Sequence, residues 1–261
     1  MSTDSTVPDE VWDGDRQPKA GELPDPSEGV EALWKAADAD VDEKTGELNW
    51  YKKAKDYWEN IPATVNGVLG GFSHISSVDI KGSQDFLKPL LSKLGKSGKI
   101  SALDCGAGIG RVTSKLLLPI FDVVDLVEFC QKFLDKARAK ISSPKAERFI
   151  CSSLQDFTPE DQRYDVVWVQ WVVGHLKDDD LVAFFKRCKQ ALKPNGYIVV
   201  KENITRKGEG DFWLDREDSS IVRSCDAFEA VFAQAELNVT RKQEQKTFPK
   251  ELFPVMMWAM N

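Results

Sequence analysis

Short apolar runs alternate with longer segments of helical spacing in the part of the chain that follows residue 98. The runs are rich in branched and aromatic residues, and we expect them to form strands at 99–104, 121–128, 146–151, 164–172 and 196–203. Apolar positions three and four apart predict helices between these strands, at 110–120, 130–141 and 178–192. This alternation predicts an α/β fold with a mostly parallel, doubly wound sheet.

The C-terminal part continues with a helix at 225–236 and two strand-like runs near 237–243 and 253–260. The stretch 204–215, which lies between the fifth strand and this helix, is rich in turn residues. We therefore expect a hairpin or a flap there.

The N-terminal part is different in character. Residues 1–45 are rich in Pro, Asp and Glu and poor in branched apolar residues, so we expect them to be mostly disordered. The spacing around 30–39 is compatible with a short helix. Residues 48–60 place aromatic side chains at helical spacing, and Pro62 ends that helix. A Gly-rich turn or loop at 66–77 and a second helix at 83–95 follow.

These patterns divide the chain into three parts. Residues 1–45 form an acidic leader, residues 46–97 an N-terminal helical lid, and residues 98–261 the domain that contains the sheet.

The charge of the chain is unevenly distributed. Residues 1–50 hold 14 acidic and 4 basic groups, a balance of −10, whereas the remaining 28 acidic and 31 basic groups give +3. The sequence has no dense basic stripe, which argues against direct nucleic-acid binding. It also has no apolar run of about 20 residues, which argues against a transmembrane helix.

The cysteine pattern limits the compartment and the chemistry. The five cysteines are widely spaced, and the only histidines are His74 and His175. Neither a disulfide framework nor a zinc site is expected from this pattern. The acidic N-terminus lacks the apolar core of a secretory signal, so we expect a cytoplasmic or nuclear protein.

A Gly-rich turn follows the first predicted strand. Gly106, Gly108 and Gly110 are spaced G-x-G-x-G, Arg111 comes next, and Glu128 ends the second strand 18 residues after Gly110. Glycines at such a turn let the backbone approach a ligand, and a carboxylate at the second strand end can accept both hydroxyls of a ribose. The pattern suits S-adenosylmethionine better than NAD, which would favour G-x-G-x-x-G. NAD, and with it an oxidoreductase, stays open at this point.

Four segments then resemble one family. LDCGAGIGRVTSKLLLP, YDVVWVQWVVGHL, LGGFSHISSVDI and the segment Asp215–Ser220 are similar to the protein N-terminal (α-N) methyltransferases that modify X-Pro-Lys N-termini. The resemblance covers residues 48–261. It implies a Rossmann-like class I S-adenosylmethionine-dependent methyltransferase, with a mostly parallel seven-stranded sheet, an N-terminal helical lid and an inserted hairpin or flap.

The resemblance also implies roles for individual residues. Those expected to bind S-adenosyl-L-methionine are Trp58, Gly106, Arg111, Glu128, Phe129, Cys130, Leu154, Gln155 and Gln170. Those expected to bind the substrate are Tyr57, Leu69, Ile75, Trp171, Asp215 and Ser220. Those expected to act in catalysis are His175, Asn203 and Asp218. The chain departs from the family pattern at Phe72, where Tyr is expected, at Glu202, where Asp is expected, and in a longer segment between Asn203 and Asp218.

Methyl transfer needs a neutral amine, and an α-amino group has an ordinary pKa of roughly 7.7–8.0. We expect Asp218 and His175 to orient this amine and to accept its proton, without deciding between them. The expected partners are proteins with exposed X-Pro-Lys or X-Pro-Arg N-termini, such as ribosomal or chromatin-associated proteins, and the chain is expected to be a monomer. A small-molecule methyltransferase on the same fold and a non-catalytic cofactor-binding adaptor are the alternatives.

Overall fold

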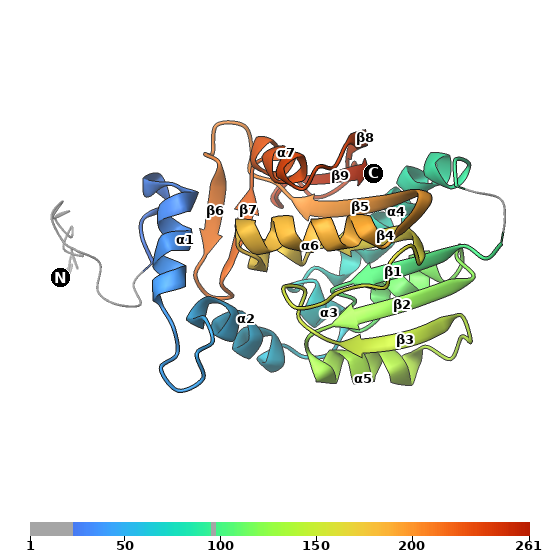
Figure 1. Cartoon of the computed structure of the whole chain (residues 1–261), viewed down its shortest axis with the longest axis horizontal. Helices are drawn as coiled ribbons and strands as arrows, with labels where there is room; N and C mark the ends of the chain where they lie inside the picture. Colours follow the sequence, from blue (N-terminus) through green and yellow to red (C-terminus); the bar gives the residue numbers. More distant parts are fainter. Residues whose placement is uncertain (1–22, 95–97) are drawn as a thin grey trace, which may run out of the picture.

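The computed structural model describes residues 23–94 and 98–261, and these form one seven-stranded sheet with helices on both faces (Figure 1). Its strands are β1 Ser101–Cys105, β2 Val123–Glu128, β3 Ala146–Cys151, β4 Tyr164–Gln170, β5 Leu192–Asn203, β8 Val239–Glu244 and β9 Val255–Met260. The order is β3-β2-β1-β4-β5-β9-β8. Only β9 runs in the direction opposite to the other six strands, so the predicted mostly parallel sheet is confirmed.

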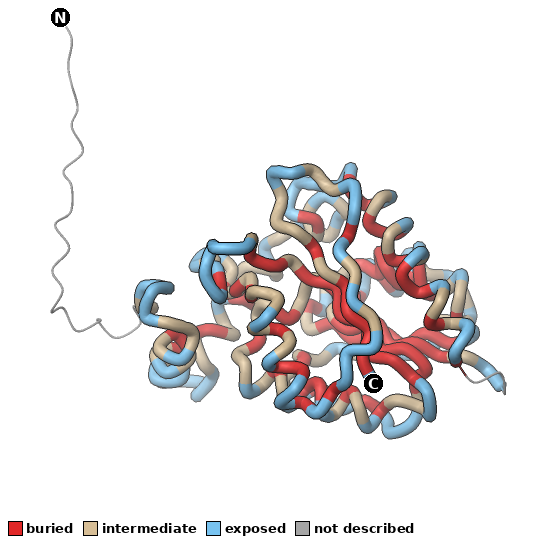
Figure 2. The backbone as a smooth tube through the Cα atoms, turned by 90° about the horizontal axis from the view of Figure 1, so that it is seen from above, coloured by how far each residue is buried: buried red, intermediate tan, exposed pale blue. Residues whose placement is uncertain are grey.

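Helices cover the two faces of the sheet. On one face lie α4 (Ser76–Leu91), a π-helical turn (Thr113–Leu117) and α5 (Gln131–Lys140). On the other lie α6 (Asp178–Gln190) and α7 (Cys225–Gln234). Because both faces are covered, β2 and β4 are buried at every position, which explains their nearly continuous apolar sequences. Figure 2 shows these buried strands at the centre of the molecule, surrounded by partly exposed helices and loops.

The region before the sheet differs from the sequence prediction. The expected loop at 66–77 contains α3 (Val65–Val68) and a 3-10 turn (Ser73–Ile75), and α4 begins at Ser76 rather than at residue 83. The amphipathic pattern of α4 is weakened because its first turns bury polar residues, Asp79 and Ser83, against the sheet. Residue 95, the predicted end of this helix, lies outside the described residues.

The predicted hairpin is displaced along the chain. It consists of β6 (Phe212–Asp215) and β7 (Ser220–Arg223), which pair antiparallel with each other in a separate two-stranded sheet. The expected range 204–215 therefore includes only its first strand. The second strand has four residues, too few for alternation to show in the sequence.

The N-terminal region is ordered earlier than expected. Residues 1–22 lie outside the described residues, so the disorder expected there stays a prediction. Residues 23–45, which were expected to be mostly disordered, contain a 3-10 turn (Pro26–Glu28) and α1 (Val30–Ala39), the one helix that their spacing allowed. Helix α2 (Asn49–Asn60) follows, as predicted for 48–60.

Candidate functional site

The carboxyl ends of four parallel strands meet at one edge of the sheet. Gly106 follows β1, Glu128 ends β2, Gln170 ends β4 and Asn203 ends β5. Ligands of open α/β sheets bind in the crevice outside these strand ends. The residues singled out from the sequence are therefore gathered at the edge where a site is expected.

Backbone amides organise the turn after β1. Gly106 has a φ of 70°, and a Cβ atom there would lie 2.5 Å from Cγ2 of Val172, so only glycine fits. The N–H groups of Gly108 and Cys130 donate to the two oxygens of Glu128, at 2.8 and 2.9 Å. Glu128 is almost fully buried, and burial raises the pKa of its carboxyl group. The two hydrogen bonds thus join the turn and the carboxylate into one unit.

A cavity opens beside this unit. Its lining includes six residues predicted to bind the cofactor: Trp58, Gly106, Arg111, Glu128, Phe129 and Gln170. Leu154 and Gln155 line an adjoining cavity that shares Phe129, Val172 and His175 with the first. Cys130 is buried and contributes its backbone N–H to Glu128 rather than a side chain to the cavity.

Arg111 and Gln170 are held from behind by a buried acid. Asp79 on α4 accepts from Nη1 of Arg111 at 2.6 Å and from Nε2 of Gln170 at 2.8 Å. It also forms an ion pair with the fully buried Lys201, at 2.5 Å between Nζ and Oδ1. Neither Asp79 nor Lys201 was expected at the site from the sequence: Asp79 lies in a stretch that reads as a loop, and Lys201 lies near the end of an apolar strand.

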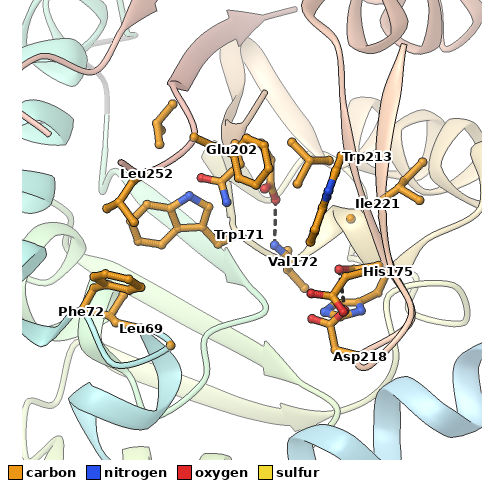
Figure 3. A pocket seen from close by; sticks show the side chains of 18 of the residues that line it. Leu69, Phe72, Trp171, Val172, His175, Glu202, Trp213, Asp218, Ile221 and Leu252 are labelled. Carbon is orange, nitrogen blue, oxygen red and sulfur yellow. Dashed lines mark hydrogen bonds between the residues drawn. The ribbon is translucent and has the colours of Figure 1, made fainter. Parts of the chain in front are cut away.

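A second cavity, of about 480 Å³, lies next to the first and shares Trp58, Leu69, Trp171, Val172 and His175 with it. The segment before α4, the ends of β4 and β5, the hairpin and the β8–β9 loop all contribute to its wall (Figure 3). Every residue predicted to act in catalysis or to bind substrate lines it except Tyr57: Leu69, Ile75, Trp171, His175, Asn203, Asp215, Asp218 and Ser220. The ring of Tyr57 packs edge-on against that of Trp58, with centroids 5.4 Å apart, and burial and then the negative charge of Asp218 raise the pKa of its hydroxyl group.

His175 is fixed at both ring nitrogens. The indole N–H of Trp58 donates to Nε2 at 2.9 Å, and Nδ1 lies 3.1 Å from the carbonyl oxygen of Ser219. Since Nε2 accepts a hydrogen bond, the proton is on Nδ1 and is donated to Ser219. His175 is therefore neutral in this arrangement and has no free lone pair.

Asp218 has a free oxygen. The Ser220 hydroxyl donates to its Oδ1 at 2.6 Å, and no described residue donates to Oδ2. Burial raises the pKa of the Asp218 carboxyl group and outweighs the lowering that a protonated His175 and the hydrogen bond from Ser220 cause. A raised pKa makes this carboxylate a better proton acceptor than a solvated Asp.

Glu202 holds the loop after β4, which carries His175. One of its oxygens accepts the N–H groups of Val172 and Val173, at 2.7 and 3.1 Å (Figure 3). Burial raises the pKa of Glu202 to about 7. The preceding Trp171 has a φ of 52°, a strained backbone for so large a residue, and places its ring in the wall of the second cavity.

Aromatic residues that the sequence analysis did not single out complete the second cavity. Trp213 from the hairpin packs against Phe253 of the β8–β9 loop, with ring centroids 5.5 Å apart, and Trp171 lies 6.3 Å from Phe248. The sequence indicates these cavity residues only by the aromatic and Pro-rich stretch 248–254, whose last two residues fall within the strand predicted near 253–260.

Known proteins resemble almost the whole described chain. The family model described as "AdoMet dependent proline di-methyltransferase" matches residues 46–261. An α N-terminal protein methyltransferase 1 from Arabidopsis thaliana is 46% identical over 241 residues, which cover 88% of this chain and 86% of that protein. An N-terminal Xaa-Pro-Lys N-methyltransferase 1-B from Xenopus laevis is 46% identical over 217 residues, 82% of this chain and 96% of that protein.

A solved structure agrees with these matches. A SAM-dependent methyltransferase from Leishmania major superposes with a TM-score of 0.80 at 39% identity, covering 89% of this chain and 91% of that one.

Proposed function

Because the chain belongs to the family of AdoMet-dependent proline di-methyltransferases, we propose that it methylates the α-amino group of proteins whose exposed N-terminus reads Xaa-Pro-Lys or Xaa-Pro-Arg. S-adenosyl-L-methionine is its methyl donor. The observation that carries the proposal is the second cavity. It joins the cofactor cavity through Trp58, Trp171 and His175, and its wall holds a free carboxylate oxygen on Asp218.

The residues of the first cavity fit the cofactor. Each carboxylate oxygen of Glu128 accepts one hydrogen bond from a backbone N–H. The second lone pair of each oxygen can accept a hydrogen bond from one of the two hydroxyls of a ribose. Gly106 leaves room where any side chain would collide with Val172. Arg111, although paired with Asp79, lines the cavity and keeps further guanidinium donors for a carboxylate. When bound, the cofactor supplies an electrophilic methyl group on a sulfonium.

The chain itself has to present a neutral, oriented amine. Asp218 accepts the proton of the incoming ammonium at Oδ2, for which the raised pKa of its carboxyl group is favourable. His175, with both nitrogens engaged, orients Ser219 and Trp58 around the amine instead of taking the proton. An α-amino group ionises near neutral pH, so positioning contributes more than basicity.

The wall of the second cavity suits a short peptide that begins with an Xaa-Pro pair. Trp171 presents a flat apolar face for a proline ring, and Asn203 can both donate to and accept from a peptide group. Asp215 accepts from the N–H of Glu217 and lines the cavity, so its carboxylate can receive a basic third residue.

The first experiment is mass spectrometry of a Ser-Pro-Lys-Arg peptide incubated with the protein and S-adenosylmethionine, beside the N-acetylated peptide. Methylation of the free peptide alone supports the proposal, and the mass ladder gives the number of methyl groups. Methylation of both peptides, or of neither while S-adenosylmethionine still binds, contradicts it.

Selectivity at the third residue is tested separately with Asp215→Asn. The variant should lose the preference for Ser-Pro-Lys-Arg over Ser-Pro-Ala-Arg, because the charge that attracts the lysine is gone. Asp211→Asn is the matched control, since Asp211 is an exposed acid of the same segment outside the cavity lining. Unchanged selectivity of the Asp215→Asn variant would reject this role.

The natural targets, expected to include ribosomal or chromatin-associated proteins, and the monomeric state stay predictions, as does the cytoplasmic or nuclear location. Within residues 23–94 and 98–261 no helix is both long and apolar enough to cross a membrane.

A further inference from the structure

Helix α1 precedes the region that the family model matches and packs against the hairpin β6–β7. Figure 1 shows the helix lying alongside the two strands, at the end of the molecule away from the sheet. The hairpin and its turn carry Asp215, Asp218 and Ser220, three residues of the second cavity. A segment outside the matched region therefore touches an element of the site.

The contact is apolar and buried. Leu33 and Ala37 on α1 are each 1% exposed and belong to one cluster with residues from both strands of the hairpin. Those hairpin residues are Phe212, Leu214 and Ile221. Because β6 and β7 pair only with each other among the described strands, the hairpin has no larger sheet to fix it. An isolated two-stranded hairpin is marginally stable, so its position depends on packing of this kind.

A polar contact fixes the turn of the hairpin. Arg216, between Asp215 and Asp218, donates through Nη1 to the carbonyl oxygen of Leu23 at 3.0 Å and through Nη2 to that of Pro24 at 2.8 Å. The two bonds place the guanidinium group against the chain just before α1. These two hydrogen bonds limit the movement of the hairpin turn that carries Asp215 and Asp218.

The same helix also reaches the loop that carries His175. Trp34 packs edge-on against Trp50, with ring centroids 5.2 Å apart, and the indole N–H of Trp50 donates to the carbonyl oxygen of His175 at 2.6 Å. The guanidinium group of Arg223 lies over the ring of Trp34, with Cζ 5.9 Å from the ring centroid, and Arg223 donates through Nη1 to the carbonyl oxygen of Val173 at 3.1 Å. Asp38 pairs with Lys177, two residues after His175.

We propose that residues 23–39 form a brace that holds the hairpin against the His175 loop and so positions Asp218 for the peptide amine. Residues 23–39 line neither cavity themselves, but the hairpin that they hold lines the peptide cavity and not the cofactor cavity. Loosening the brace therefore weakens peptide binding and turnover and leaves S-adenosylmethionine binding unchanged. The kinetic part of this inference depends on the proposed function, whereas the structural part does not.

The test compares Leu33→Asn with Lys35→Asn in the full chain. Both variants place asparagine in the same turn of α1, so they share any loss of helix propensity, but only Leu33 is buried against the hairpin. Three quantities are measured: hydrogen exchange of residues 212–223, the KM and kcat for Ser-Pro-Lys-Arg, and the Kd for S-adenosylmethionine.

Leu33→Asn should speed hydrogen exchange in the hairpin and raise the peptide KM about tenfold or more, with the cofactor Kd within about twofold of the original. Lys35→Asn should match the original protein in all three. The brace is rejected if Leu33→Asn leaves hairpin exchange unchanged, if exchange rises while KM and kcat stay constant, or if the cofactor Kd rises in parallel with the peptide KM. If the original protein does not methylate the peptide, the proposed function fails, and hydrogen exchange still decides whether α1 holds the hairpin.

Discussion

The indole N–H of Trp58 donates to Nε2 of His175, 2.9 Å away, and this bond joins the helix beside the cofactor cavity to the loop of the peptide cavity. The bond occupies the ring nitrogen that would otherwise act as a base. In the proposed mechanism this bond separates two roles that the sequence left open: Asp218 takes the proton, and His175 positions its neighbours.

Asp218→Asn should lower kcat/KM for the peptide by about 100- to 10,000-fold, because the amide cannot accept a proton. Trp58→Phe removes one hydrogen bond to a neutral ring and should cost about tenfold or less. Steady-state kinetics with Ser-Pro-Lys-Arg measure both effects, and calorimetric titration of S-adenosylmethionine shows whether Asp218→Asn still binds the cofactor. An Asp218→Asn variant that keeps its activity would contradict this role and favour His175 as the proton acceptor.

The sheet was predictable because its signal is local. β2 and β4 are covered on both faces, and their sequences are therefore apolar runs. Helix α6 begins with three acidic residues and ends with basic ones, so each of these elements can be recognised from its own sequence. The start of α4 was not predictable, since Asp79 looks like a loop residue until Lys201 is seen beside it. Lys201 lies 122 positions from Asp79, and no pattern within a short window records such a pairing.

The site was predictable only as far as the resemblance reached. Trp171, His175, Asn203 and Asp218 do surround one cavity, although their roles stay predictions. The resemblance gave no warning that Trp58 blocks Nε2 of His175, because hydrogen-bond partners depend on the approach of α2 to the β4 loop. It also begins after α1, so it left the brace outside the expected site.

Glu202→Gln should change how stability depends on pH. Burial raises the pKa of Glu202 from its ordinary value of 4.5 to about 7, so between these values the folded protein binds more protons than the unfolded chain. Stability from this group is therefore lost as pH rises from about 4.5 to about 7, by about 2–3 kcal/mol at about 1.4 kcal/mol per pKa unit. Gln keeps an oxygen for the N–H groups of Val172 and Val173 but does not titrate.

Urea unfolding at pH 5 and pH 8 measures this difference. The original protein should lose more stability than Glu202→Gln between the two pH values. Asp104, whose pKa burial raises to about 6, contributes the same amount to both proteins and cancels in the comparison. Equal losses would show that Glu202 does not carry this pH dependence.

Asp79→Asn should destabilise the fold by about 3–5 kcal/mol, because it leaves Arg111 and Lys201 buried without their counter-charge. Asp85→Asn on the same helix is the matched control. Its ion pair with Lys81 is exposed to solvent, and removing it should cost about 0–1 kcal/mol. Free energies of unfolding in urea measure both changes, and similar values for the two variants would contradict a structural role for the buried pair.

Gly106→Ala should strongly weaken cofactor binding without unfolding the protein. The new Cβ would lie 2.5 Å from Cγ2 of Val172, so the turn after β1 must move, and Gly108, which donates to Glu128, moves with it. The φ of 70° adds strain of its own, and Gly208→Ala isolates that part, since Gly208 has a φ of 90° with no atom within 4 Å of its Cβ position. Titration with S-adenosylmethionine should give a Kd raised about 100-fold or more for Gly106→Ala and unchanged for Gly208→Ala. If both variants bind equally well, the turn tolerates the displacement, and the close approach of backbone to cofactor inferred for Gly106 is wrong.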